Sequence, residues 1–368
     1  MRQARIGLAA TTVILLAIGV VMIYSASAVY ASEIYHDGFY YLKRHAVALA
    51  IGVVLSVAIL LFDYRKLRRW AKPLCVVTAV LIGCTFLPVI SREVAGASRW
   101  LRVGPWSFQP SELAGIAIIL YLADFLARRG GLDPLTWRKT VPLASLVGLI
   151  VAMILAQPDL GTAFCYGSVA LVMCLIAGLS PKYLMAPLVC AAPAFYVLVY
   201  SVPYRWNRIA AFLDPWADPR GSGFQIIQSF VAISVGGLTG VGLGNSTQKL
   251  FYLPAAHTDF VFAIIGEELG MIGAVVITGL FMLWLIFAGR IAYRAPDVFS
   301  QLLAAGLTVL VTLRAVINIG VNTGALPTKG LPLPFISYGG SALILCMVAT
   351  ALLLNISRRA TALGEVEE

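Results

Sequence analysis

Asp259 is the acidic residue best placed for chemistry in this sequence. It follows His257 and Thr258, at the point where a long polar segment meets an apolar run that begins near residue 260. One interpretation is an N-terminal carboxylate that caps a helix and interacts favourably with its dipole. The other is a general base, because a carboxylate between water and a low-dielectric interior has a raised pKa and can accept a proton from a hydroxyl group.

Three arginines on the same predicted side of the molecule form a second candidate group. Arg99 lies in the segment Gly96–Leu101, and Arg205 and Arg208 follow an apolar run that ends near residue 202. Guanidinium groups bind phosphate oxygens through charge-assisted hydrogen bonds, so the three together could hold a pyrophosphate. Binding of Arg99 to lipid headgroups alone remains an alternative.

Further polar residues interrupt or flank the apolar runs. Ser111 and Glu112 fit an ordinary helix cap and first turn beside an interfacial segment that contains Trp100 and Trp106. Asp159 lies between a proline and a glycine, as in a tight turn. The segment 328–341 contains two prolines and three glycines, which indicates a re-entrant or folded loop that borders a cavity.

Glu267 and Glu268 lie inside a predicted helix, at a depth of roughly 12 Å from Asp259 for a rise of 1.5 Å per residue. Acidic groups at that depth are costly, so they are expected to face the interior of a bundle. Arg314 is the predicted partner of one of them. A structural ion pair is favoured over a proton pathway.

The elements that position these groups are apolar helices. Hydrophobic residues make up 60% of the 368 positions and charged residues 12%, and mean hydropathy is +0.90, so most of the chain is predicted to lie in lipid. The predicted fold is a single domain, an all-α polytopic membrane protein with about ten transmembrane helices. The apolar runs that predict them are 6–31, 45–62, 73–90, 111–127, 141–157, 161–179, 183–202, 260–288, 299–323 and 340–356.

Basic residues predict that both termini lie in the cytoplasm. With the N-terminus inside, the inner connections carry sixteen Lys and Arg residues and the outer ones ten, and cytoplasmic loops retain basic residues during insertion. Residues 203–259 are predicted to form a large extracytoplasmic loop between helices 7 and 8, and 357–368 a short cytoplasmic tail. Long outer connections also occur at 91–110 and 324–339, and long ordered loops often hold function.

Composition argues against several other classes of protein. The formal charge is +10, but the basic residues form short clusters between apolar runs, as topology signals do, which argues against nucleic-acid binding. The six cysteines are scattered through apolar stretches without the spacing of disulfides or metal sites. A phosphate-binding loop, a His metal cluster and a Ser-His-Asp arrangement are not recognisable in the sequence.

Taken in order, these segments resemble the SEDS family, the shape, elongation, division and sporulation proteins typified by RodA and FtsW. Lys249-Leu250 and Pro327-Thr328-Lys329-Gly330 look more like the FtsW and SpoVE branch than the RodA branch. The resemblance implies one SEDS-type transmembrane domain, 1–368, in the bacterial cytoplasmic membrane. It runs nearly end to end, through 24–27, 96–112, 157–162, 223–244, 253–270 and 329–341.

The resemblance implies a peptidoglycan glycosyltransferase that polymerises lipid II into glycan strands on the outer face, in cell division, elongation or sporulation. Carried over by motif, Asp259 is the proposed catalytic residue, expected to deprotonate the acceptor hydroxyl as it attacks the anomeric carbon of the donor. Other residues would bind the diphosphate or shape the sugar and lipid sites: Arg99, Arg205, Arg208 and Lys329 for the diphosphate, and Gln109, Ser111, Glu112, Asp159 and Ser337 for the sugar and lipid.

One departure from the family pattern puts a residue's role in doubt. Where the family usually has a lysine a few residues after the Pro-Ser-Glu motif, this chain has Leu113-Ala114-Gly115-Ile116. Either the diphosphate contacts are redistributed onto the arginines, or this member differs in its optimum or its activity.

Two other functions remain open. A transporter that flips lipid II fits ten helices with buried charges, although the motifs cluster on the outer face, which favours an enzyme. The third possibility is a non-catalytic scaffold that recruits a transpeptidase. The resemblance implies as partners lipid II, the growing glycan strand, a class B penicillin-binding protein, other division or elongation proteins and membrane lipids. A divalent cation, Mg or Mn, on the diphosphate is chemically plausible, but no dedicated ligand cluster is visible.

Overall fold

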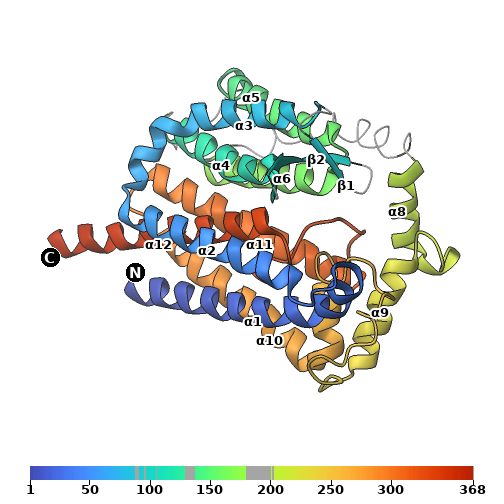
Figure 1. The fold of residues 1–368 in the computed structure, drawn as a ribbon. Coiled ribbons are helices and arrows are strands. Elements are labelled where there is room, and N and C mark those ends of the chain that lie inside the picture. Colours follow the sequence, from blue (N-terminus) through green and yellow to red (C-terminus); the bar gives the residue numbers. More distant parts are fainter. Residues whose placement is uncertain are drawn as a thin grey trace.

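The computed structural model describes residues 1–87, 91–94, 97–104, 106–128, 137–179, 200 and 203–367. Helices dominate it and form a bundle with both termini at one end (Figure 1). Among the described residues, six helices are long and apolar enough to cross a membrane: α1 (Arg2–Tyr35), α2 (Tyr40–Leu61), α4 (Pro110–Arg128), α10 (Val261–Tyr293), α11 (Val298–Asn322) and α12 (Gly340–Glu367).

Three further apolar helices, α3 (Ala71–Cys84), α5 (Trp137–Ala156) and α6 (Leu160–Ile176), complete the described part of the bundle. Nine of the ten predicted apolar runs thus coincide with helices, and the fold class of a polytopic helical membrane protein is confirmed. The seventh run, 183–202, lies almost entirely outside the described residues. Helix α12 continues to Glu367, so the segment 357–368, predicted to be a tail, is largely helical.

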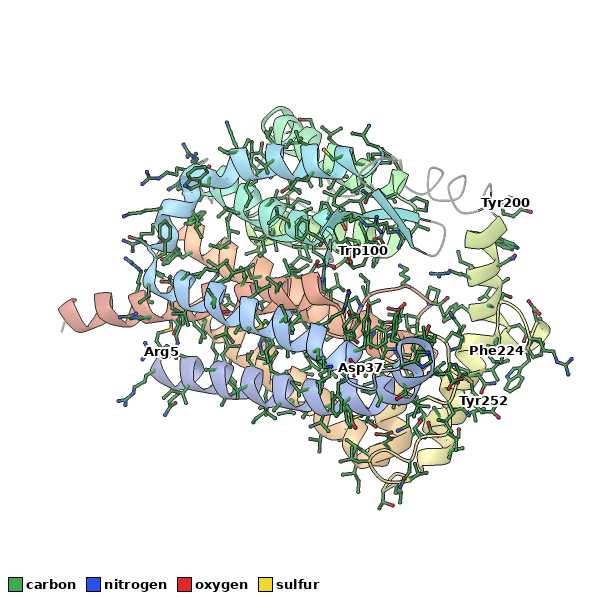
Figure 2. All side chains as sticks on the ribbon, in the orientation of Figure 1. Arg5, Asp37, Trp100, Tyr200, Phe224 and Tyr252 are labelled. Carbon is green, nitrogen blue, oxygen red and sulfur yellow. The ribbon has the colours of Figure 1, made fainter. Side chains whose placement is uncertain are left out.

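The two ends of the bundle differ in the residues they carry. Arg5 lies at the end that holds both termini, and Asp37, Phe224 and Tyr252 lie toward the other end (Figure 2). The ring of His257 is 5.6 Å from the ring of Tyr30, near the C-terminal end of α1. The region around Asp259 therefore lies at the end of the bundle opposite the termini.

The segment before α4 folds into a small antiparallel sheet that the sequence did not predict. Its strands are β1 (Ser91–Val94), β2 (Ala97–Val103) and β3 (Trp106–Phe108), in that order. Leu101 of β2 pairs with Phe108 of β3 and is buried against the bundle. The sheet contacts the start of α4 and so fixes Arg99, on β2, at that end of the molecule.

The segment 203–259, predicted to be a loop, contains regular structure. It holds α8 (Pro203–Leu213), the short 3-10 helix η2 (Pro215–Ala217) and α9 (Phe224–Gly236), and α9 packs on α10. An apolar face on α9 explains the packing, because Ile226, Ile227 and Ala232 are all buried. The predicted extracytoplasmic connection thus contains helices of its own.

Helix α10 is broken at Gly270, although its sequence reads as one apolar run. Gly270 has φ 68° and ψ −168°, a conformation that favours glycine. Backbone groups freed by the break pair with a neighbouring segment: Val241 N–H donates to Glu267 O at 3.0 Å, and Met271 N–H donates to Gly237 O at 2.9 Å. A break within an apolar helix is tolerated because its backbone groups find partners inside the protein.

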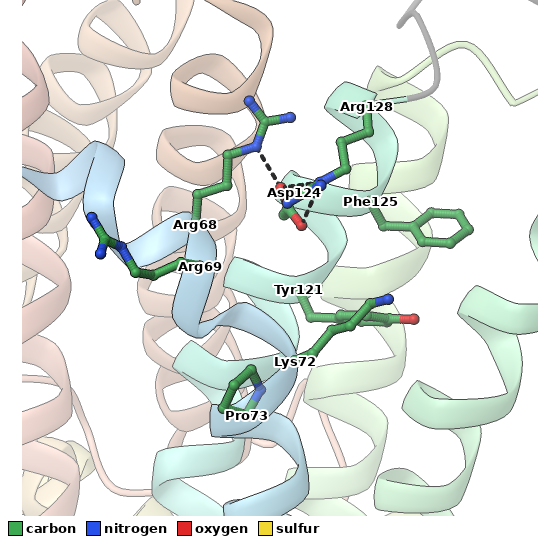
Figure 3. A pocket seen from close by; sticks show the side chains of 8 residues that line it. All are labelled: Arg68, Arg69, Lys72, Pro73, Tyr121, Asp124, Phe125 and Arg128. Atoms are coloured by element: carbon green, nitrogen blue, oxygen red, sulfur yellow. Dashed lines mark hydrogen bonds and ion pairs between the residues drawn. The ribbon is translucent and has the colours of Figure 1, made fainter.

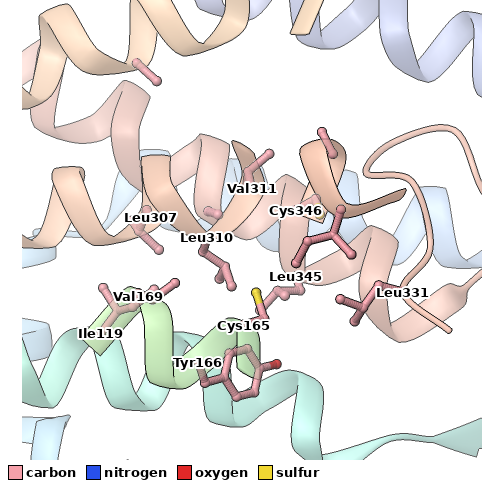
Figure 4. Packing of buried hydrophobic residues seen from close by; sticks show 14 of the residues in the cluster. Ile119, Cys165, Tyr166, Val169, Leu307, Leu310, Val311, Leu331, Leu345 and Cys346 are labelled. Atoms are coloured by element: carbon pink, nitrogen blue, oxygen red, sulfur yellow. The ribbon is translucent and has the colours of Figure 1, made fainter. Parts of the chain in front are cut away.

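Close packing between α4, α6 and α11 forms the centre of the core. Ile119 of α4 and Val169 of α6 face Leu307, Leu310 and Val311 of α11 (Figure 4), and all five are buried. In lipid, such packing contributes through van der Waals contact between the helices rather than through removal from water. This core holds α11 in a fixed position, from which its polar residues reach the candidate site.

Candidate active site

Asp259 lies in the turn that leads into α10, and its backbone is fixed by α11. The Nδ2 atoms of Asn318 and Asn322 donate to the Asp259 carbonyl oxygen at 2.9 Å and 3.0 Å. The Oδ1 atom of Asn322 also accepts from the N–H of Ala263, in the first turn of α10, at 3.0 Å. Two amide side chains one helical turn apart thus hold both the acid and the start of its helix.

The carboxylate of Asp259 has no partner among the residues that the structure describes. Within the described part of the chain, it takes part in no hydrogen bond and no ion pair, and it does not cap α10. Burial raises the pKa of this carboxyl to about 6, an effect opposed by the nearby positive charges of Arg208 and Arg99 and reinforced by Asp159. A carboxyl with a pKa of about 6 is still mostly ionised at neutral pH and is more basic than an ordinary aspartate, so it suits a general base.

The segment that carries Lys329 passes directly beside this acid. A β-carbon placed on Gly330 would lie 3.2 Å from Oδ2 of Asp259, so the backbone of the segment and the carboxylate are in close contact. Asn318 Nδ2 also donates to the carbonyl of Leu331 at 2.8 Å, which ties the segment to the backbone of Asp259 through one side chain. The ammonium of Lys329 lies 4.1 Å from the centroid of the Phe164 ring, and burial lowers the pKa of this lysine.

Arg99 reaches from the sheet to the turn that precedes α6. Its Nε donates to Gln157 O at 3.0 Å and its Nη2 to Pro158 O at 2.5 Å. Its Nη1 lies 3.8 Å from Oδ2 of Asp159, whose Oδ1 caps α6 by accepting from the N–H of Thr162 at 3.2 Å. The predicted tight turn is therefore present, and hydrogen bonds from Arg99 to its carbonyl groups stabilise it.

Arg208 of α8 completes the group of cations described around Asp259. Its Nη1 donates to the carbonyl of Thr328 at 3.2 Å, immediately before Lys329. The side chain of Arg205, which was predicted to join this group, lies outside the described residues. Arg99, Arg208 and Lys329 thus come from three separate segments, and Arg99 and Arg208 both act electrostatically on Asp259.

An unpaired carboxylate beside such cations has a definite chemical capacity. The carboxylate can accept a proton from an attacking hydroxyl, while the cations neutralise an anionic group that binds or leaves nearby. No cluster of three or more His, Cys, Asp or Glu side chains suited to a metal ion occurs among the residues described.

The polar residues around the start of α4 are mostly engaged within the protein. Glu112 is buried and forms an ion pair of 2.7 Å with Arg314, and Ser111 accepts from Gln109 Nε2 at 3.0 Å. Ser337 is buried and accepts from the N–H of Leu333 at 2.9 Å, which stabilises the turn before α12. In the structure these residues make contacts that hold α4 and the loop in place, and their role in shaping the substrate site stays a prediction.

The predicted ion pair between Arg314 and Glu267 or Glu268 is wrong. Arg314 points to α4 and pairs with Glu112. Glu268 pairs instead with Lys249 at 2.8 Å, and Glu267 accepts from the N–H and hydroxyl of Thr247 at 2.8 Å and 2.9 Å. The break at Gly270 accounts for the difference, because it brings the segment after α9 against this part of α10.

Gly115 is the position at which the family resemblance led us to expect a lysine, and the ring of Tyr166 occupies the space next to it. A β-carbon on Gly115 would lie 3.0 Å from that ring. The hydroxyl of Tyr166 donates to the Ser111 carbonyl at 2.7 Å and accepts from Arg314 Nη2 at 2.9 Å. The buried cation that pairs with Glu112 is Arg314 of α11. A longer side chain at Gly115 would displace the ring of Tyr166.

Asn318, Asn322 and Tyr166 were not identified from the sequence. The two asparagines lie four residues apart in an apolar helix, and polar residues at that spacing share one face. That pattern was a usable signal for a functional or structural contact. Tyr166 gave no comparable signal, because a single tyrosine in an apolar run fits ordinary packing equally well.

Comparison with known proteins adds independent information. A family profile described as "Cell cycle protein", which covers FtsW, RodA and SpoVE, matches residues 7–362. The chain is 45% identical over 341 residues to the probable peptidoglycan glycosyltransferase FtsW of Geobacter metallireducens, covering 93% of this chain and 91% of that protein. It is 42% identical over 347 residues to stage V sporulation protein E of Bacillus subtilis, covering 94% and 95%.

Solved structures agree with these relatives. RodA of Thermus thermophilus is similar with a TM-score of 0.71 and 28% identity, over 96% of each chain. A chain from a structure described as showing "structural coordination of polymerization and crosslinking by a peptidoglycan synthase complex" has a TM-score of 0.78 and 31% identity, over 96% of this chain and 97% of that one. The similarity therefore extends over the fold as well as the sequence.

Proposed function

Because the chain belongs to the FtsW/RodA/SpoVE family of cell cycle proteins, we propose that it is a peptidoglycan glycosyltransferase of the FtsW-like branch. It polymerises lipid II into glycan strands at the outer face of the cytoplasmic membrane. The observation that carries this proposal is the carboxylate of Asp259, which has a pKa of about 6, pairs with no residue in the described part of the chain and lies near Arg99, Arg208 and Lys329. The names of the relatives support the same activity.

In the proposed reaction, a sugar hydroxyl of the acceptor attacks the anomeric carbon of the donor. The carboxylate of Asp259 accepts the hydroxyl proton as the new bond to oxygen forms. The bond from the anomeric carbon to the lipid diphosphate breaks, and the diphosphate leaves with both bonding electrons. A single displacement of this kind inverts the configuration at the anomeric carbon.

The leaving diphosphate carries the negative charge that develops in the transition state. Arg99 and Arg208 are each anchored by hydrogen bonds to backbone carbonyls, at 3.0 Å to Gln157 and 3.2 Å to Thr328. Anchored donors stabilise a developing charge without first having to reorganise. Lys329, held over Phe164, adds a third cation from the segment that touches Asp259.

The proposed setting is that of a multi-pass membrane protein with both termini in the cytoplasm. This orientation rests on the excess of basic residues in the predicted inner connections. It places Asp259, at the opposite end, on the outer side where lipid II is polymerised. A class B penicillin-binding protein is the proposed partner, with other division or elongation proteins, and the similar chain from a peptidoglycan synthase complex supports this assignment. Mg or Mn on the diphosphate remains a proposal that rests on chemistry alone.

A polymerisation assay tests the function directly. Purified Asp259→Asn, given labelled lipid II, should form no glycan chains, because the amide cannot accept the proton. Glu33→Gln is a matched control, since it removes one exposed carboxylate near the same end of the bundle. Polymer formation by Asp259→Asn at the rate of the unaltered protein would contradict the proposed reaction. Translocation of lipid II that survives the change, without polymer from either protein, would favour a transporter.

A further inference from the structure

A basic cavity of about 350 Å³ lies between the C-terminal end of α4 and the N-terminal end of α3 (Figure 3), and these helix ends are on the same side of the bundle as both termini (Figure 1). It is formed by η1 (Tyr64–Trp70), the start of α3 and the last two turns of α4. Four cations and one carboxylate line it, which leaves a net charge of +3: Arg68, Arg69, Lys72, Arg128 and Asp124.

Asp124 fixes two of these cations in place. Its carboxylate is almost fully buried and accepts hydrogen bonds from Nε of Arg68 and Nε of Arg128, the latter at 2.8 Å and 3.0 Å (Figure 3). Both arginines therefore use their inner nitrogen. The Nη atoms of both side chains form no hydrogen bond or ion pair with a residue in the described part of the chain, and the Arg68 guanidinium lies 5.6 Å from the centroid of the Phe299 ring.

Two guanidinium groups held in this way are suited to bind phosphate. A guanidinium tethered through Nε still offers its Nη donors to an oxyanion, and its orientation is fixed in advance. The Arg68 and Arg128 side chains are 39% and 61% exposed, so an anion can reach both. Lys72 and Arg69, both exposed, line the same cavity and form no ion pair with a described residue.

The cavity lies where the bundle meets a membrane surface. Helix α2 ends at Leu61, α3 begins at Ala71 and α4 ends at Arg128, so the lining residues follow or precede apolar helices directly. Trp70 is 57% exposed beside the cavity, and tryptophan is enriched at the level of lipid headgroups. Lys and Arg side chains at the level of the headgroups are attracted to anionic lipids.

We propose that this cavity binds the phosphate group of an anionic lipid headgroup, in the leaflet at the end of the bundle that carries the termini. Topology signals explain why basic residues are present there. They do not require two guanidinium groups to share a buried carboxylate at the edge of a cavity. The group recognised is a phosphate ester. Free inorganic phosphate could supply a similar anion, so the experiment must distinguish it from the lipid.

Binding of phosphatidylglycerol to the purified full-length chain tests the proposal. The probe is titrated against the protein in neutral detergent, with phosphatidylcholine and inorganic phosphate titrated separately. Lys72→Gln/Arg128→Gln should weaken the affinity for phosphatidylglycerol about 30-fold, from two lost headgroup contacts. Lys66→Gln/Arg358→Gln removes the same charge at the same end, from exposed residues that do not line the cavity, and should change affinity by less than about threefold.

A second variant guards against loss of fold. Arg69→Gln/Lys72→Gln keeps both ion pairs of Asp124 and should weaken phosphatidylglycerol binding in the same direction. An equal loss in the control variant would overturn the proposal, because only overall charge would then matter. Equal affinity for phosphatidylcholine, or inorganic phosphate binding more tightly than the lipid, would also overturn it.

Discussion

The carboxylate of Asp259 lies directly against the backbone of Gly330, with only 3.2 Å between Oδ2 and the position of an added β-carbon. Contacts this short leave no room for a side chain at Gly330 unless the acid moves. The same segment carries Lys329, so the backbone that touches the acid also carries one of the nearby cations. The proposed reaction depends on that spacing.

Gly330→Ala should therefore lower the polymerisation rate while leaving the fold intact. Displacing a catalytic group by a fraction of an ångström reduces rates by about tenfold, and by about 100-fold for a full ångström. The initial rate of glycan formation measures the effect. Gly339→Ala is the matched control in the same loop, because its β-carbon would meet its nearest neighbours at 3.6 Å or more. Similar rates for the two variants would show that the contact with Asp259 does not matter.

The raised pKa of Asp259 predicts the pH dependence of the reaction. Below a pKa of about 6 the carboxyl is protonated and cannot accept a proton, so kcat should fall about tenfold per pH unit on the acid side and level off above it. Arg208→Gln removes a charge that lowers this pKa, so the acid limb should move to higher pH. A profile of kcat at saturating lipid II measures both effects. An acid limb that stays in place in Arg208→Gln would exclude Asp259 as the titrating base.

The buried ion pair between Arg314 and Glu112 predicts a large effect on stability. Arg314→Met would leave Glu112 charged and unpaired in the interior, at a cost of about 3–5 kcal/mol in the free energy of unfolding. The double variant Arg314→Met/Glu112→Leu should recover most of that loss, since no charge remains buried. Unfolding in mixed micelles of increasing SDS content measures the difference. A double variant less stable than Arg314→Met would contradict this account.

The break in α10 predicts that Gly270 tolerates no side chain. A β-carbon there would lie 2.4 Å from Leu238 O and Gly240 N, and its φ of 68° is unfavourable for other residues. Gly270→Ala should therefore destabilise the protein by at least about 2 kcal/mol in the same unfolding assay. Gly279→Ala, in the same helix with open space around it, should be neutral or stabilising by up to about 1 kcal/mol. Equal stability of the two variants would mean that the break is not required.

The apolar helices could be predicted from the sequence because length and composition alone define them. Runs such as 299–323 and 340–356 match α11 and α12 closely at their starts. The break at Gly270 could not be predicted in this way, since its backbone partners come from residues 237–242. The strands before α4 were missed because short strands with mixed polarity resemble an interfacial loop.

The partners of the buried charged residues could not be predicted from the sequence for a similar reason. Three acids, Glu112, Glu267 and Glu268, were available to Arg314, and helix rotation decides among them. Arg314 and Glu112 are separated by 202 positions in the chain, so no local pattern records their contact. The sequence and the family resemblance pointed to Asp259, but the contact with Gly330 and the two asparagines became visible only in three dimensions.

Asn318 has a consequence for how the site could be regulated. Its single amide group donates both to the carbonyl of Asp259 and to that of Leu331. A pull on the loop from outside, by a bound protein or a glycan chain, would therefore shift the proton acceptor together with Lys329. Movement of this one loop could then change activity, because Asp259 and Lys329 would move together.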